Sequence, residues 1–184
     1  IDPVHLETRK MKLAVYRCPS DSGPEFWTIQ DDTGVALSDL ATANYIGVFG
    51  TTEIDSCEGL PIGIPCVGNG VFFHNSSLRL ADVRDGLSQT FLIGERMTNS
   101  ELKWHSTWAG YVPDGEEAAV RLLGASDHTP NHPNNHFDDF SSHHTGGAHF
   151  LLGDGGIRFI STNINLSVYQ ALSTRASRDV VGDF

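Results

Sequence analysis

The chain contains 184 residues, enough for one well-buried core, because single domains commonly contain ~100 to 200 residues. With 12 Lys and Arg residues against 23 Asp and Glu residues, the net charge is −11, and no basic patch offsets it, which excludes nucleic acid as an expected partner. No apolar run approaches the ~18 to 20 residues that cross a bilayer. We expect a single domain over residues 1–184.

Short strands dominate the expected secondary structure. Residues 1–12 are polar and are interpreted as the remainder of a truncated N-terminal region. The 19 Gly and 8 Pro residues favour strands and structured loops over a helical bundle, because both interrupt helices. Clusters of aromatic and β-branched residues bounded by turn-forming residues predict five strands, at residues 25–29, 44–49, 71–73, 90–93 and 107–112.

The three cysteines are Cys18, Cys57 and Cys66. Cys57 and Cys66 bracket a short segment with two Gly and two Pro residues that can fold back on itself. A disulfide across it would stabilise the fold by ~2 to 3 kcal/mol and would indicate an oxidising compartment. The alternative is two unpaired buried thiols, and the pairing of Cys18 is left open.

A β-hairpin and a helix are predicted near the end of the chain. Residues 148–152 and 157–160 flank the sequence Gly-Asp-Gly-Gly, which supplies the positive φ angles that tight hairpin turns require. Asn163 or Asn165 then caps a helix over residues 166–175. The fold class is therefore α+β: an antiparallel sheet with long loops, a C-terminal hairpin and a short terminal helix.

Residues 124–145 form a long loop that is rich in histidine. His128, His132 and His136 recur every four residues and would share one face of a helix, as ligands of a transition metal. Pro130 and Pro133 argue against that helix. Calcium, which takes six to eight oxygen ligands, is the other ion considered, with carboxylates drawn from Asp114, Glu116, Glu117, Asp138 and Asp139. No cofactor is required.

Aromatic residues are the candidate ligand-binding groups. Aromatic rings with polar rims suit sugar stacking, although such residues more often belong to a core. The candidates are Trp27, Tyr45, Trp104, Trp108 and Tyr111. Of these, Trp104, Trp108 and Tyr111 are the predicted ligand-binding residues.

The sequence has no Gly-x-Ser-x-Gly elbow, His-Glu-x-x-His, phosphate-binding Gly loop or Cys-x-x-Cys. We predict that the protein is not an enzyme.

Nine residues separate His144 from Asp154-Gly155. This pattern, and the whole stretch of residues 140–161, resembles the terminal block of the H-X9-DG family, prepilin-type processing-associated proteins abundant in planctomycetes and also catalogued as a domain of unknown function with a solute-binding label. Further blocks agree in the same order, namely Tyr16-Arg-Cys-Pro-Ser-Asp21, Asn44-Tyr45-x-Gly47 and residues 82–95. The departures are His143, where the family usually has Arg, and Gly153, where it often has Ala.

The resemblance implies an extracellular or periplasmic pilin-like head domain. It also implies a hydrophobic N-terminal helix and a prepilin-peptidase site outside this sequence, with export through a type II secretion or type IV pilus-like machine. That helix would make the membrane contact and the contacts with other copies or with pseudopilus partners. The expected function is a structural or adhesive subunit of a surface filament or pseudopilus, with extracellular polysaccharide as ligand. The alternative is a metal-dependent solute-binding or hydrolytic domain that uses the His-rich loop.

His144 and Asp154 are not expected to touch, because ten residues of extended strand span ~33 Å. The favoured interpretation is structural. Asp154 caps the turn through side-chain to backbone hydrogen bonds, Gly155 takes a positive φ, and local partners hold His144. The functional alternative is that one of these residues lines a ligand groove.

Overall fold

The protein has a mixed α+β fold with two β-sheets. The computed structural model describes residues 3–57, 60, 64–178, 181–182 and 184. The larger sheet has five strands in the order β6-β3-β4-β7-β8, namely β3 (Tyr45–Gly50), β4 (Phe91–Glu95), β6 (Leu123–Ala125), β7 (Gly147–Leu152) and β8 (Ile157–Ser161). The smaller sheet has the order β1-β2-β5, namely β1 (Phe26–Gln30), β2 (Ala36–Ala43) and β5 (Ser106–Thr107). The strand pairs are antiparallel except β3 and β6, which run parallel.

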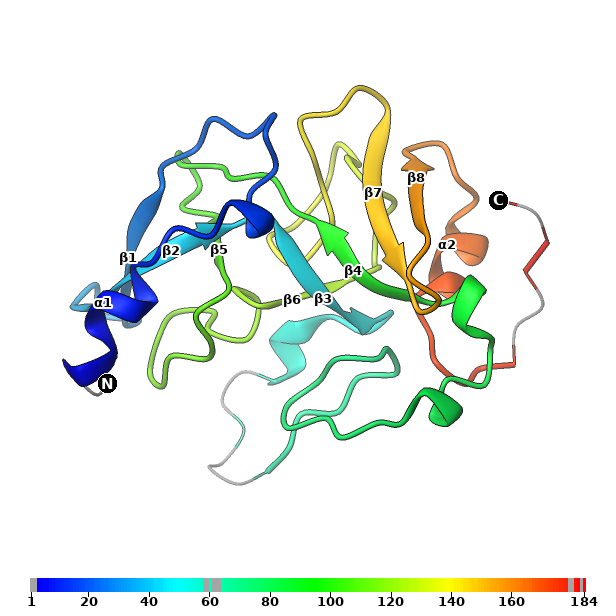
Figure 1. The fold of residues 1–184 in the computed structure, drawn as a ribbon, viewed down its shortest axis with the longest axis horizontal. Coiled ribbons are helices and arrows are strands. Elements are labelled where there is room, and N and C mark those ends of the chain that lie inside the picture. The colour runs from blue at the N-terminus through cyan, green and yellow to red at the C-terminus, as the bar shows by residue number, and fades with distance from the viewer. Residues whose placement is uncertain (1–2, 58–59, 61–63, 179–180, 183) are drawn as a thin grey trace.

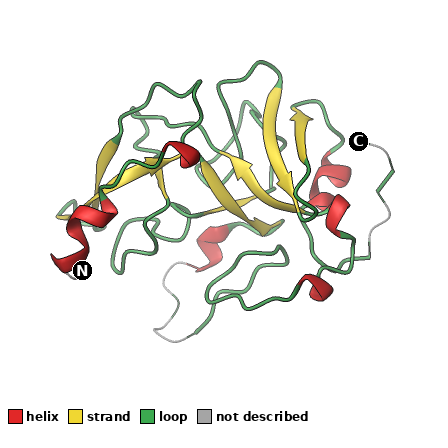
Figure 2. Cartoon of the chain, in the orientation of Figure 1, coloured by secondary structure: helices red, strands yellow, loops and turns green. Residues whose placement is uncertain are grey.

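Helices are few and short, and Figure 2 shows the strands joined by long loops. The α-helices are α1 (Leu6–Arg9) and α2 (Leu166–Leu172), and the 3₁₀ turns are η1 (Pro3–His5), η2 (Ala14–Tyr16), η3 (Ile54–Cys57), η4 (Leu80–Asp82) and η5 (Leu87–Gln89). In the described part of the chain, none of these helices is long and apolar enough to cross a membrane. The interpretation of residues 1–12 as a truncated remainder stays a prediction.

The main core lies between α2 and the larger sheet, which are neighbours in Figure 1. Side chains alternate along β7, so that Phe150 and Leu152 are buried while His149 lies on the opposite face. The Phe150 ring stacks on Phe91 of β4 with centroids 4.3 Å apart, and Tyr169 of α2 packs on both rings. This apolar layer fixes the positions of β4 and β7.

The C-terminal hairpin and the helix that follows it confirm the prediction from local sequence. The Asp154 carboxylate accepts the Gly156 N–H at 2.8 Å, and Gly155 has φ +86°. Asn165 is the N-cap, with its side chain accepting from the backbone N–H groups of residues 167 and 168. The helix ends at Leu172 and not at residue 175, because the hydroxyls of Ser173 and Thr174 donate to the last carbonyls.

Three of the five predicted strands are present in the structure, and the other two predictions were wrong. Residues 25–29, 44–49 and 90–93 overlap β1, β3 and β4. Residues 71–73 are irregular and bond to β3 through single contacts such as Phe72 N–H to Val48 O. Residues 107–112 contribute only Thr107 to β5, since the Thr107 hydroxyl accepts the Ala109 N–H and turns the chain. The longest strand, β2, was not predicted because its alanine-rich sequence lacks β-propensity.

Candidate functional site

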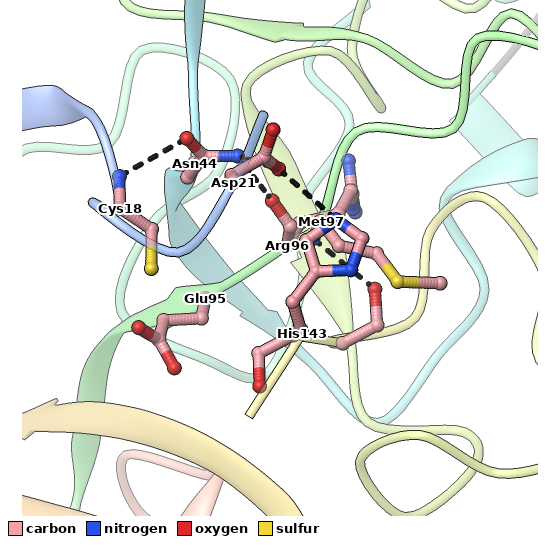
Figure 3. Close-up of a pocket in the computed structure, with 9 residues that line it drawn as sticks. Cys18, Asp21, Asn44, Glu95, Arg96, Met97 and His143 are labelled. Atoms are coloured by element: carbon pink, nitrogen blue, oxygen red, sulfur yellow. Dashed lines mark hydrogen bonds and ion pairs between the residues drawn. The ribbon is translucent and has the colours of Figure 1, made fainter. Parts of the chain in front are cut away.

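Residues from four distant parts of the chain meet beside the junction of β3 and β4. Cys18 and Asp21 come from the N-terminal segment, Asn44 precedes β3, and Glu95 ends β4. They line a pocket of about 10 Å³ together with Arg96, Met97 and residues 141–143 (Figure 3). A space of this size holds roughly one water molecule or one ion.

Asn44 anchors the N-terminal segment at this pocket. Its side-chain oxygen accepts the Cys18 N–H at 3.1 Å, and its amide donates to Asp21 at 2.6 Å and to the Arg96 carbonyl at 3.0 Å. The Asp21 carboxylate also accepts the backbone N–H groups of residues 23 and 98. The polar groups of Asn44 and Asp21 are therefore used in holding the Cys18 turn against β4.

His144 is held by both local and distant partners. Its backbone N–H donates to the nearby Ser142 hydroxyl at 3.0 Å, while its ring contacts two residues from distant segments. Its Nε2 lies 3.4 Å from Cys18 Sγ and 3.3 Å from Glu95 Oε1. The other Glu95 oxygen accepts the His149 N–H at 2.6 Å and lies 3.1 Å from His149 Nδ1. Burial raises the pKa of the adjacent Tyr45 to about 12, and the charges of Cys18 and Glu95 add to the effect.

Arg96 is a buried cation that no sequence motif indicated. It is 2% exposed, and its guanidinium donates to the carbonyls of Val120, Leu123, Asp138 and Asp139. Burial lowers its pKa to about 9, so the group stays charged at neutral pH. Arg96 therefore joins β4 to residues 120–123 and 138–139 through backbone carbonyl groups.

The three regularly spaced histidines of the 124–145 loop come together without a helix. The His128 ring stacks on His132 at 4.8 Å and lies edge-on to His136 at 5.0 Å. The prolines do exclude a helix, as predicted, but the turns around Pro130 and Pro133 still bring the three rings together. As predicted, the loop beyond Ala125 has no regular element.

Asp139 organises this histidine cluster. Its carboxylate accepts the backbone N–H groups of His128 and His136 and lies 3.0 Å from His128 Nδ1. Burial raises its pKa. Within the described residues, Asp138 and Asp139 group with His136 as metal-type ligands, but Asp114, Glu116 and Glu117 join no such group. The structure thus separates the carboxylates that were considered together for calcium.

Two of the three predicted ligand-binding aromatics line one surface hollow. Trp108 and Tyr111 border a hollow of about 310 Å³, whose other lining residues are His5, Thr8, Arg9, Ala109, Gly110 and Val112. Trp108 also stacks on Tyr16 and donates from its indole to the Met11 carbonyl at 3.2 Å, which fixes its ring. Trp104 instead stacks on Phe137 in a second core cluster, and Trp27 packs against His105.

Cys57 and Cys66 form the predicted disulfide. Cys57 ends η3, and both residues pack against the core cluster around Phe49 and Val120. Residues 58–59 and 61–63 between them lie outside the described residues. Cys18 is a free, buried thiol.

Comparison with known proteins gives one match. Residues 2–167 match the model of a family described as "Protein of unknown function (DUF1559)". No curated protein and no solved structure matches the chain.

Proposed function

The chain belongs to the DUF1559 family of proteins of unknown function, and from this premise we propose that it is a structural or adhesive module located outside the cytoplasm. In this proposal it is the head domain of a pilin-like or pseudopilin-like subunit of a surface filament or secretion pseudopilus. It has no catalytic role. The observation that carries the proposal is the Cys57–Cys66 disulfide, because such bonds persist in oxidising compartments and are rare in the cytosol.

The hydrogen bonds around Asn44 support a structural role. Asn44 and Asp21 direct their polar atoms at backbone groups and at each other, which holds three chain segments together. Reactive sites usually keep some polar groups unpaired until a substrate arrives. A rigid scaffold of this kind suits a filament subunit.

The adhesive part of the proposal rests on the hollow beside Trp108 and Tyr111. Tyr111 is 59% exposed, and Trp108 is fixed by its contacts with Tyr16 and Met11. Exposed ring faces with a polar rim that includes Thr8 stack on sugar rings. Because the chain carries a net charge of −11, a neutral polysaccharide is the expected ligand.

A glycan-binding screen with the purified chain tests the adhesive role. Tyr111→Ala and Trp108→Ala should each weaken binding of the best glycan about tenfold, the equivalent of ~1.4 kcal/mol. Phe159→Ala is the matched control, since Phe159 is an exposed aromatic residue on β8, away from the hollow. Absence of glycan binding, or an equal loss in Phe159→Ala, would remove the adhesive role.

Protease treatment of intact cells tests the location. The protein should be digested without lysis, and protein recovered under thiol-blocking conditions should carry the Cys57–Cys66 disulfide with only Cys18 alkylated after denaturation. A protected protein with three alkylated cysteines would contradict the proposal.

A second candidate function is a metal-dependent solute-binding or hydrolytic domain. The observation that favours it is the cluster of His128, His132 and His136 rings. Stoichiometric zinc that is lost in His136→Ala, together with hydrolytic activity, would support this function over the structural one.

A further inference from the structure

We propose that Cys18, Glu95 and His144 form a binding site for a single divalent ion of the zinc class, with the fourth position open to water. The three ligand atoms, one each of sulfur, oxygen and nitrogen, lie within 4.8 Å of one another. Zinc accepts this combination of thiolate, carboxylate and imidazole. The inference does not depend on the proposed structural or adhesive function.

Two of the three separations between ligand atoms agree with a tetrahedral ion. Zinc bonds of ~2.3 Å to sulfur and ~2.0 to 2.1 Å to nitrogen and oxygen place sulfur and nitrogen ~3.5 Å apart, and nitrogen and oxygen ~3.3 Å apart. Cys18 Sγ lies 3.4 Å from His144 Nε2, and that nitrogen lies 3.3 Å from Glu95 Oε1. The site can therefore accept the ion without rearrangement of these pairs.

The contacts of His144 distinguish a metal site from a catalytic relay. In a Cys-His-carboxylate relay, the thiol and the carboxylate contact opposite nitrogens of the imidazole. Here Cys18 and Glu95 face the same nitrogen, Nε2. A single nitrogen cannot make good hydrogen bonds to both, whereas an ion at their common point takes a lone pair from each ligand.

Each ligand is positioned by a group outside the set. His149 holds one Glu95 oxygen through its N–H at 2.6 Å and its ring at 3.1 Å, which leaves Oε1 directed at His144. Asn44 fixes the Cys18 backbone, and the Ser142 hydroxyl accepts the His144 N–H at 3.0 Å. Outer partners of this kind orient metal ligands in known sites.

The burial of Glu95 favours a bound cation, and the partial exposure of His144 gives an ion access to the site. The Glu95 side chain is 4% exposed and Cys18 is 6% exposed. A buried carboxylate is costly without a compensating partner, and a bound ion would supply one at Glu95 Oε1. Arg96, the next residue, turns its guanidinium away to backbone carbonyls. The His144 side chain is 28% exposed, so an ion can enter past the imidazole.

Cobalt titration of the untagged, chelator-treated chain tests the site. Cys18 is the free cysteine, because Cys57 and Cys66 form a disulfide. A thiolate-to-cobalt charge-transfer band therefore reports on Cys18 alone. We expect this band to saturate at one equivalent of Co²⁺ and to disappear when Zn²⁺ is added. Absence of the band would overturn the proposal.

Variants separate the ligands from their surroundings. Cys18→Ser should abolish the band, and Glu95→Gln and His144→Ala should each weaken Co²⁺ binding by more than tenfold. His149→Ala should weaken binding about tenfold with the band retained at saturation, as expected for a positioning residue. His128→Ala, in the other cluster, is the control that should leave band and affinity unchanged.

Thermal melting of each metal-free variant checks folding. Because His144 is partly exposed, His144→Ala carries the test if the buried Glu95→Gln variant fails to fold. An unchanged band and affinity in folded His144→Ala would overturn the proposal, as would loss of the band in His128→Ala.

Discussion

Two clusters of imidazoles and carboxylates use similar residue types to different ends. In the loop cluster, defined by His128, His132, His136 and Asp139, the central carboxylate accepts two backbone N–H groups and lies 3.0 Å from a ring nitrogen, all within eleven residues. In the thiol cluster, defined by Cys18, Glu95, His144 and His149, the partners come from segments up to 126 residues apart. Glu95 keeps one oxygen directed at an imidazole nitrogen. The two clusters therefore differ in how far the carboxylate oxygens are used by backbone N–H groups, more than in residue type. A carboxylate whose oxygens are both used stabilises a turn, whereas one with an oxygen left over can bind a ligand.

Arg96 supports both clusters, and its removal should have the largest effect. It follows Glu95 in the chain and donates to the carbonyls of Asp138 and Asp139. Arg96→Ala should lower the free energy of unfolding by about 3 kcal/mol or more, because each buried carbonyl left without a donor costs ~1 to 3 kcal/mol. Urea denaturation measures this loss. The control Arg158→Ala, at an exposed position on β8, should stay within about 0.5 kcal/mol. An equal loss of unfolding free energy in Arg96→Ala and Arg158→Ala would show that Arg96 does not support the two clusters.

Asp139→Asn tests the loop cluster and should cost about 2 kcal/mol, since the amide keeps one acceptor oxygen for the two backbone N–H groups of His128 and His136. Burial raises the pKa of Asp139, so the folded state binds its proton more tightly than the unfolded state. Its contribution to stability is therefore largest below the unfolded pKa of ~3.9 and declines as pH rises through the folded pKa.

Urea denaturation from acid to neutral pH checks this sign. The stability of the wild-type chain, relative to Asp139→Asn, should fall across that window. Asp127→Asn, at a partly exposed neighbour of His128, is the matched control and should show little pH-dependent difference. A wild-type advantage that grows with pH would contradict the assignment.

The terminal hairpin provides a reference outside both clusters. Asp154→Ala removes the hydrogen bond to Gly156 and should lower the free energy of unfolding by about 1 kcal/mol. Metal binding at the thiol cluster should be unaffected. Unchanged melting together with a loss of ligand binding would show that Asp154 belongs to a site and not to a turn.

The smallest effect on the metal-free protein is expected for His144→Ala. The side chain is partly exposed, so the change in unfolding free energy should be about 0.5 kcal/mol. Zinc at 100 times its dissociation constant should stabilise the wild-type chain by ~2.7 kcal/mol and leave His144→Ala unchanged. Differential scanning calorimetry with and without zinc measures both effects. Equal zinc stabilisation of both proteins would place the ion elsewhere.

The features that could be predicted from the sequence are those set by residues close together in the chain. The turn at Asp154 and Gly155, the Asn165 cap and the Cys57–Cys66 bond each depend on residues close together in the chain. The histidine spacing was visible, but the turns that convert it into a cluster were not. The thiol cluster could not be predicted because its members lie in three separate blocks, and the sequence of one block does not indicate which other blocks it contacts in the fold. Strand β2 was missed because its alanine-rich sequence has little β-propensity, and its partners β1 and β5 are known only from the fold.

The strand order of the larger sheet constrains how a growing chain can fold. Only β7 and β8 are joined by a tight turn, whereas β4 pairs with β3 before it and with β7 after it. During synthesis from the N-terminus, the second edge of β4 therefore stays unpaired until some fifty further residues have been made. The ring contact between Phe91 and Phe150 cannot form before then. Fragments that stop short of Gly147 should expose this edge and associate, because an unpaired apolar strand templates aggregation.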